Sequence, residues 1–124
     1  MANSVGLHEA EERLSPETID RHRAIASIQE ELEAIDWYDQ RVNATSDGEL
    51  AALLAHNRDE EKEHAAMTLE WLRRRDPVFD QHLRTYLFTT ETVTEVEHEA
   101  EGKGTEADAG DGSLGIGGLK GEAQ

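Results

Sequence analysis

A small group of residues in this sequence has the types and spacing of metal ligands. Glu61 and His64 form Glu-x-x-His, and on a helix this spacing places a carboxylate and an imidazole on one face, within reach of one ion. Glu31 borders an apolar stripe of an earlier segment, and Tyr38 follows about two turns further along the same side. The chain has no cysteine, so a metal site must use Glu, Asp and His.

Helix start and stop signals predict the elements that carry these residues. Ser15 and Pro16 supply an N-cap and a first helical position. Polar residues 43–48 then break the helical pattern, and Ser46-x-x-Glu49 has the form of a capping box for a second helix. The first helix is predicted from an apolar stripe of Ile25, Ile28, Leu32, Ile35 and Val42.

The second helix is predicted to begin near Asp47 and to run to about Arg75, which makes an antiparallel hairpin with the first. Asp76-Pro77 stops this helix and starts a short third one. The inward stripe of the second helix has apolar ends and a polar middle. It is predicted to contain Leu50, Leu53/Leu54, Asn57, Glu61, His64, Thr68 and Trp71/Leu72.

Simple counting places the two acidic positions at one level of the hairpin. Glu31 lies 15 residues before Ser46, taken as the middle of the turn, and Glu61 lies 15 residues after it. Burying an unpaired carboxylate costs several kcal/mol, so an inner level with two Glu and one His needs protons, Arg or a metal ion to neutralise it. The matched level and the interrupted apolar stripe favour a metal.

Composition sets limits on partners and on the size of the core. The chain has 124 residues, with 12 Lys and Arg against 28 Asp and Glu, a net charge of −16 that would repel nucleic acid and anionic lipid. The longest apolar run, Leu50–Ala55, is too short for a membrane span, and the start of the sequence lacks a signal-peptide pattern, so we expect a cytoplasmic protein. Few aromatic residues and a thin core favour self-association.

The domain prediction follows from the same composition. We expect a disordered N-terminus over 1–14 and a helical domain over 15–90. Residues 91–111 are predicted to be a flexible acidic linker, because most of the glycines lie beyond Gly102 and large apolar residues are scarce there. Residues 112–124 form a tail whose Leu114, Ile116 and Leu119 are unusual in a purely solvating end.

This ligand set is half of a known kind of site. In ferritin-like di-iron proteins, two bundle helices each supply a Glu and the other two each supply Glu-x-x-His. A twofold dimer of this chain would therefore hold four Glu and two His around two metals, and four carboxylates balance two Fe²⁺. Mixed carboxylate and imidazole ligation suits iron, and zinc and manganese accept the same ligand types.

Longer runs make the chain resemble one family, the encapsulated ferritins, which are truncated ferritin relatives packaged inside bacterial encapsulin shells. The resemblance covers about residues 17–90 and the tail. It is carried by EELEAIDWYDQR (Glu30–Arg41), HNRDEEKEHAAMTLEWLRRR (His56–Arg75), HLRTYLF (His82–Phe88) and GSLGIGGLK (Gly112–Lys120).

The resemblance implies an all-α, ferritin-like hairpin plus a short third helix, which completes a four-helix bundle by dimerisation. It further implies a ferroxidase that oxidises Fe²⁺ to Fe³⁺ with oxygen, an annular homodecamer of dimers, and iron storage inside an encapsulin nanocompartment that binds the tail Gly112–Lys120. Glu31, Glu61 and His64 are the implied ligands, with Tyr38 and Trp37 beside them. Outside the centre, it implies a metal-attracting site at Glu30 and Glu33 and a secondary site at His56, Glu60 and Glu63.

Two other interpretations remain open at the level of sequence. A structural or adaptor hairpin would use the tail to dock a partner, with its internal acids only tuning assembly. A di-metal protein of other chemistry, for example peroxide scavenging or hydroxylation, would require a substrate channel, which the sequence does not display.

Overall fold

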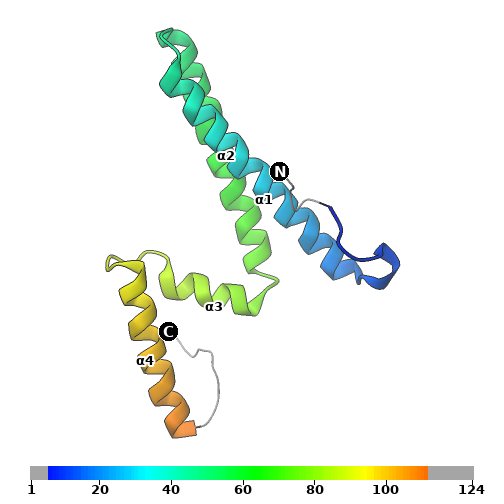
Figure 1. Ribbon diagram of the computed structural model, residues 1–124, viewed down its shortest axis with the longest axis vertical. Coiled ribbons are helices and arrows are strands. Elements are labelled where there is room, and N and C mark those ends of the chain that lie inside the picture. The colour runs from blue at the N-terminus through cyan, green and yellow to red at the C-terminus, as the bar shows by residue number, and fades with distance from the viewer. Residues whose placement is uncertain (1–5, 112–124) are drawn as a thin grey trace. The chain divides into compact units, whose positions relative to one another are not determined.

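The computed structural model describes residues 6–111, with side chains as far as Gly102, and within that range it is all-helical as predicted (Figure 1). The chain divides into two compact units on either side of the Leu72–Arg73 bond. The sequence predicts a single folded segment over 15–90 instead. The elements are the 3₁₀ turn η1 (Glu11–Arg13) with α1 (Pro16–Ala44) and α2 (Gly48–Arg73), then α3 (Pro77–Tyr86) and α4 (Val93–Asp111).

Two helix starts are confirmed by their caps. The Ser15 hydroxyl accepts a hydrogen bond from the Thr18 backbone N–H at 3.1 Å, and Pro16 is the first residue of α1. The Asp76 carboxylate accepts from the Phe79 N–H at 3.0 Å, and Pro77 opens α3. Both pairs satisfy a donor that has no partner inside the helix.

The predicted capping box at Ser46 is wrong, because the next residue takes its place. Asp47 Oδ1 accepts from the backbone N–H of Glu49 at 2.9 Å and of Leu50 at 3.0 Å. An ionised carboxylate is a stronger acceptor for these donors than a hydroxyl, and it also complements the positive end of the helix dipole. α2 therefore begins at Gly48, and it ends at Arg73, two residues before the predicted end.

Replacing Asp47 with alanine is expected to lower the free energy of unfolding by about 1 kcal/mol, the usual cost of losing an N-cap. Ser46→Ala is the matched control and should change it little, because the cap is one residue further on. Chemical denaturation followed by circular dichroism measures both. If Ser46→Ala proved the more damaging change, the assigned cap would be incorrect.

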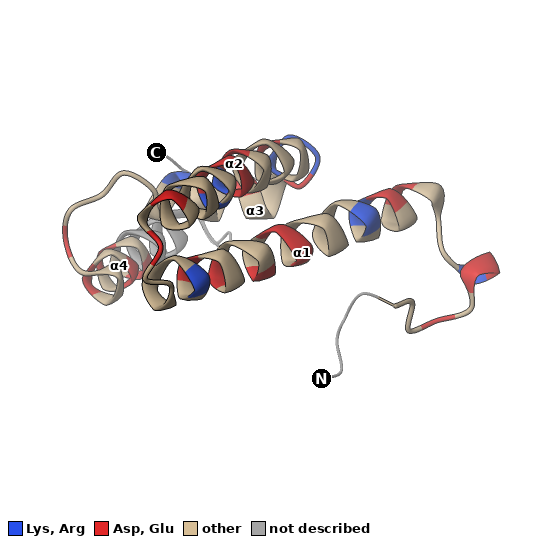
Figure 2. Ribbon diagram, turned by 90° about the horizontal axis from the view of Figure 1, so that it is seen from above, with Lys and Arg blue, Asp and Glu red and all other residues tan. Residues whose placement is uncertain are grey.

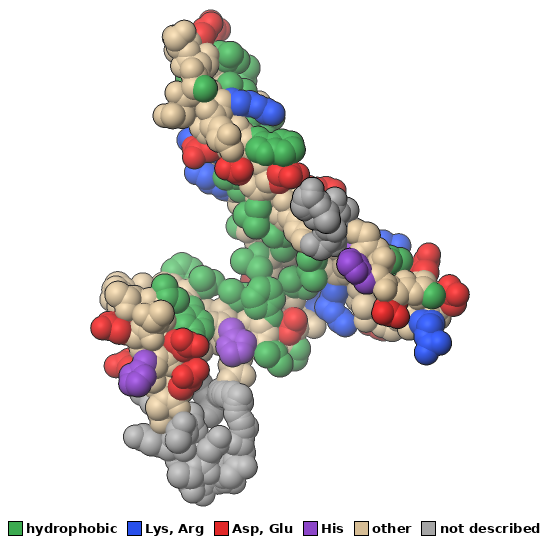
Figure 3. Space-filling view, viewed as in Figure 1, with side chains coloured by type: hydrophobic (Ala, Val, Ile, Leu, Met, Phe, Trp, Pro, Cys, Tyr) green, Lys and Arg blue, Asp and Glu red, His purple; other side chains and the backbone are tan. Residues whose placement is uncertain are grey.

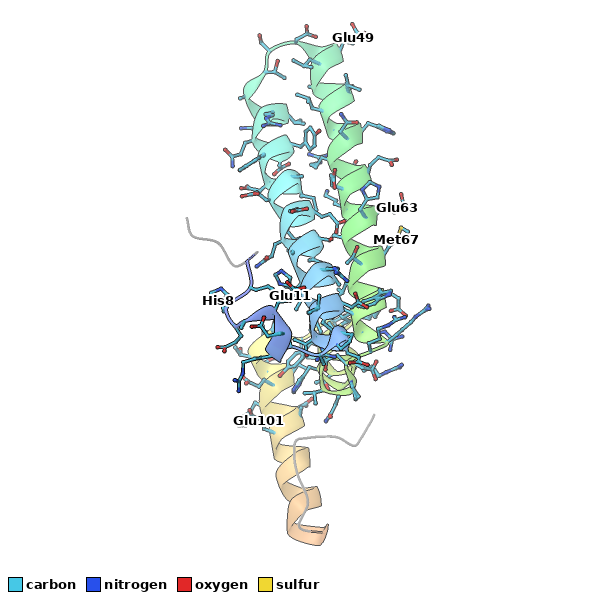
Figure 4. The ribbon with its side chains drawn as sticks, turned by 90° about the vertical axis from the view of Figure 1, so that its right-hand side faces the viewer. His8, Glu11, Glu49, Glu63, Met67 and Glu101 are labelled. Atoms are coloured by element: carbon cyan, nitrogen blue, oxygen red, sulfur yellow. The ribbon has the colours of Figure 1, made fainter. Side chains whose placement is uncertain are left out.

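α1 and α2 form an antiparallel hairpin, in which the two helices lie together near the connecting turn and diverge toward their other ends (Figures 1 and 4). Half-buried or buried residues recur along both helices at alternating intervals of three and four, the spacing of helices that pack along a common seam. We call these the seam residues. They are Ala24, Ile28, Glu31, Ile35, Tyr38 and Val42 on α1, and Ala51, Leu54, Arg58, Glu61, Ala65, Thr68 and Leu72 on α2.

The seam corrects the inward stripe predicted for the second helix. Glu61, Thr68 and Leu72 belong to the seam, whereas Leu50, Leu53 and His64 are exposed. The prediction followed the largest apolar side chains, but the buried face of α2 is rotated toward the smaller Ala51 and Ala65. His64 therefore lies at the edge of the hairpin, next to the seam.

The core is as thin as the composition predicts. Among the described side chains only Leu72 and Val96 are buried, and large apolar residues remain exposed on α1 and α2. Figure 3 shows hydrophobic side chains open to solvent along these two helices. They include Ile25, Leu32, Trp37, Leu50, Leu53 and Met67. This surface favours self-association. None of the helices in the described part of the chain is long and apolar enough to span a membrane.

The predicted linker over 91–111 is largely helical, which corrects the sequence interpretation. α4 begins after Thr92, whose hydroxyl accepts from the Glu95 N–H at 3.3 Å, and it packs against α3 with Val96 buried. Burial, together with the nearby Glu97 and Glu101, raises the pKa of Tyr86 in the same unit. The predicted disordered N-terminus contains η1, while residues 1–5 and the tail 112–124 lie outside the described residues.

Candidate metal centre

The two residues of Glu-x-x-His meet on α2 as the spacing predicts. His64 Nδ1 lies 3.5 Å from Glu61 Oε1. The Glu61 side chain is 28% exposed and the His64 side chain 48% exposed, so the pair runs from the seam to the open edge of the hairpin. An ion that bound both groups would enter from this edge.

Glu31 occupies the seam of α1 in an unusual state. Its Oε1 atom is buried and has no hydrogen-bond partner among the described residues. Leaving a buried acceptor unsatisfied costs about 1–3 kcal/mol, and more when the group is charged. A bound cation would satisfy a buried carboxylate oxygen that lacks a hydrogen-bond partner. Glu31 is therefore a candidate metal ligand.

One chain does not gather a complete ligand set. No group of three or more His, Asp or Glu side chains capable of holding a metal ion is found among the described residues. Glu31 on α1 and the Glu61–His64 pair on α2 therefore do not form a closed site within the described residues of a single copy. Their chemistry, two carboxylates and one imidazole, fits a divalent metal such as Fe²⁺.

The aromatic residues predicted beside the centre lie on different surfaces. Tyr38 is a half-buried seam residue two positions along the seam from Glu31, and the guanidinium carbon of Arg41 lies 5.5 Å from the centroid of its ring. This distance is within the range of a cation–π contact. Trp37 is half exposed.

The outer acidic residues are brought together only in part. Glu30 and Glu33 are both exposed on α1, where acidic segments recur along the helix (Figure 2). His56 Nε2 lies 3.8 Å from Glu60 Oε2, so this pair meets across one turn of α2. Glu63 extends from the side of α2 that faces away from α1 (Figure 4), and it does not complete a three-ligand group within the described chain.

An arginine that the sequence pattern does not single out lies beside the proposed ligands. Arg58 is a seam residue three positions before Glu61, and its side chain is 21% exposed. Its Nη1 lies 2.8 Å from Asp39 Oδ1 across the hairpin, and its Nε lies 3.1 Å from Asp59 Oδ1. The hydrogen bond to Asp59, and then that to Asp39, raises the pKa of Arg58, and the same arginine lowers the pKa of Asp59. Its position in the sequence could have revealed it, because Arg58 lies four residues after Leu54 and three before Glu61, in register with the α2 seam.

Comparison with known proteins identifies related chains over most of the sequence. The profile of the EncFtn-like family matches residues 6–90. A curated relative from Rhodospirillum rubrum, named encapsulated ferritin-like protein, is 61% identical over 129 residues, which cover 98% of this chain and 92% of the relative. A protein of Myxococcus xanthus, named encapsulin nanocompartment cargo protein EncC, is 36% identical over 75 residues, 60% of this chain and 58% of that protein.

A solved structure supports the fold. The crystal structure of protein ne0167 from Nitrosomonas europaea superimposes with a TM-score of 0.69 and is 64% identical in sequence. The match covers 71% of this chain and 97% of that chain.

Proposed function

The chain belongs to the EncFtn-like family, and from this premise we propose that it is a ferroxidase whose di-iron centre is completed by a second copy. Two hairpins pair into a four-helix bundle, each supplying Glu31, Glu61 and His64. The centre binds two Fe²⁺ as substrate, each iron loses one electron, and oxygen is the acceptor. The resulting Fe³⁺ is delivered for storage as mineral.

The observation that carries this proposal is the buried, unpartnered oxygen of Glu31. In an adaptor hairpin this oxygen would only cost free energy, because an apolar residue at position 31 would make the protein more stable. A cation supplied between two copies would satisfy it, and His64 and Glu61 lie at the edge from which a second copy would approach.

In this proposal, each of the predicted site residues has a separate role. The two Glu31 carboxylates would bridge or ligate both irons, and each Glu61 and His64 pair would hold one of them. The Tyr38 phenol orients a ligand or supplies a redox-active group beside the metals. Glu30 and Glu33 raise the local concentration of Fe²⁺, and His56, Glu60 and Glu63 form an outer secondary site.

The tail and the assembly complete the proposal. Dimers join into an annular decamer, and Gly112–Lys120 docks on the inner wall of an encapsulin shell in the cytoplasm. Support comes from the names of the two curated relatives, one encapsulated ferritin-like and one an encapsulin cargo. An open ring of two-helix subunits cannot enclose a mineral, so storage inside a shell follows from the proposed geometry. Many tails on one ring would bind by effective concentration.

The test combines oxidation with native mass. Purified protein is mixed with Fe²⁺ in air while ferric absorbance is followed, and native mass spectrometry is recorded before and after anaerobic loading. We expect oxidation faster than in protein-free buffer and two irons for every two chains. A chain that binds no iron and leaves the background rate unchanged would support the adaptor interpretation instead.

A further inference from the structure

Arg58 lies three residues before Glu61 on α2, so its side chain could compete with a metal ion for that carboxylate. Residues three apart on a helix are neighbours, with about 5–6 Å between their Cβ atoms, so Arg58 and Glu61 share the seam face of α2. Arginine keeps its charge at any ordinary pH and pairs readily with carboxylates. A direct Arg58–Glu61 pair would occupy the carboxylate that Fe²⁺ needs.

The structure shows Arg58 engaged elsewhere. Its Nη1 and Nε bind Asp39 and Asp59, and Asp59 is also held by Lys62, whose Nζ lies 3.3 Å from the same Oδ1. Glu61 Oε1 instead lies 3.5 Å from His64 Nδ1. The cation and the proposed ligand thus have separate partners although they are neighbours on one helix.

The positions of the two aspartates explain toward which edge of the hairpin the Arg58 guanidinium points. Asp39 follows the seam residue Tyr38, and Asp59 follows the seam residue Arg58 itself, whereas His64 precedes the seam residue Ala65. In an antiparallel pair, the positions that follow the seam residues on both helices share one edge, and those that precede them share the other. Asp39 and Asp59 therefore hold the guanidinium toward the edge opposite His64.

We propose that Asp39 and Asp59 are positioning residues, which hold Arg58 away from Glu61 and so keep the Glu61 carboxylate available to a divalent cation. This inference rests on the proposed function, because it assigns a task to residues around the same centre. Without the two aspartates, the half-buried arginine pairs with a carboxylate on its own face, Glu61, and competes with the metal.

The experiment measures Co²⁺ affinity by anaerobic titration calorimetry, with the visible absorption of bound Co²⁺ as a second signal. Asp39→Asn with Asp59→Asn should weaken Co²⁺ binding at least about tenfold. Adding Arg58→Met should restore it to within about threefold of wild type, since the competing charge is gone while the packing of the stem is kept. Arg58→Met alone should bind at least as tightly as wild type.

The controls separate this role from net charge and from hairpin stability. Asp20→Asn with Asp36→Asn removes the same two charges from exposed positions of α1 and should change Co²⁺ affinity less than threefold. Arg58 variants that bind weakly would show that the arginine only fixes the hairpin, and an unchanged affinity in the Asp39, Asp59 variant would also overturn the inference. Wild-type protein that binds no Co²⁺ and oxidises no Fe²⁺ would overturn the proposed function itself.

Discussion

Glu31→Ala is expected to slow Fe²⁺ oxidation by about 100-fold or more, since loss of even an outer partner of a metal ligand costs about 10–100-fold. Glu61→Ala and His64→Ala should have comparable effects, because each removes one donor from a set that a single chain only half supplies. Stopped-flow ferric absorbance, with iron and oxygen in excess, measures the initial rate for each variant.

Replacing Glu31 should lower activity but raise the stability of the metal-free protein. Its Oε1 is buried without a hydrogen-bond partner in the described structure, so an apolar residue removes an unsatisfied group from the seam. The metal-free Glu31→Leu variant should therefore unfold with a free energy about 1 kcal/mol or more above that of wild type. Added Fe²⁺ should stabilise wild type under anaerobic conditions and leave this variant unchanged.

Glu17→Gln is the matched control, since Glu17 is an exposed carboxylate in the first turn of the same helix. It should leave the oxidation rate within about twofold of wild type. Ligand variants that oxidise iron as fast as this control would remove the proposed centre. A Glu31→Leu variant that is both inactive and less stable would instead make Glu31 a structural residue.

The sequence predicts a helix start well where a single side chain is available to cap it and a proline follows. Ser15-Pro16 and Asp76-Pro77 each combine a side-chain acceptor with a fixed proline φ, and both begin a helix as predicted. Asp47 was missed because two acceptors stand side by side, and sequence alone does not show which one meets the free N–H groups. α4 was missed because the glycines beyond Gly102 outweighed the Val-, Ala- and Glu-containing segment before them.

For the proposed centre, the sequence predicts the contact between Glu61 and His64, but it does not predict what surrounds Glu31 and Arg58. Glu-x-x-His places Glu61 beside His64 in any helix, so the sequence sufficed for that contact. The unpartnered oxygen of Glu31 depends on which side chains α2 presents to it. The link from Arg58 to Asp39 depends in the same way on how the two helices pack, and a stripe drawn through the largest apolar residues placed that seam incorrectly.

The second large effect concerns the surface on which the second copy would lie. Leu53 and His64 are 11 residues apart, close to three helical turns, so they share one side of α2. Leu53 is 56% exposed and the His64 side chain 48% exposed. A second copy that brings its own Glu61 and His64 to this edge would also cover Leu53, and burying its exposed part would contribute about 1 kcal/mol or more.

Leu53→Glu should therefore leave the protein monomeric and slow Fe²⁺ oxidation about 100-fold, although every proposed ligand is retained. Burying the new carboxylate between two copies costs several kcal/mol, enough to prevent pairing at micromolar concentration. Sedimentation velocity measures the mass and ferric absorbance the rate, on the same samples. Circular dichroism should show unchanged helix content, because Leu53 is outside the seam.

Ile25→Glu provides the matched control for this surface. Ile25 is 44% exposed, but it follows the seam residue Ala24, which places it on the edge opposite His64. This variant should keep the di-iron unit and its oxidation rate. Equal loss in both variants would point to a general effect of added charge, since both changes replace an aliphatic side chain of the same size with glutamate.

Comparing Leu53→Glu with Glu31→Ala distinguishes the effect of losing the dimer from the effect of losing a metal ligand. Glu31→Ala keeps the apolar edge and should still pair, whereas Leu53→Glu keeps the ligands and should not. A monomeric Leu53→Glu that oxidised Fe²⁺ at the wild-type rate would mean that one chain suffices. That outcome would contradict the absence of a three-ligand group among the described residues of a single copy. Loss of oxidation in both variants, with loss of pairing in only one, is the result expected of a centre that symmetry completes.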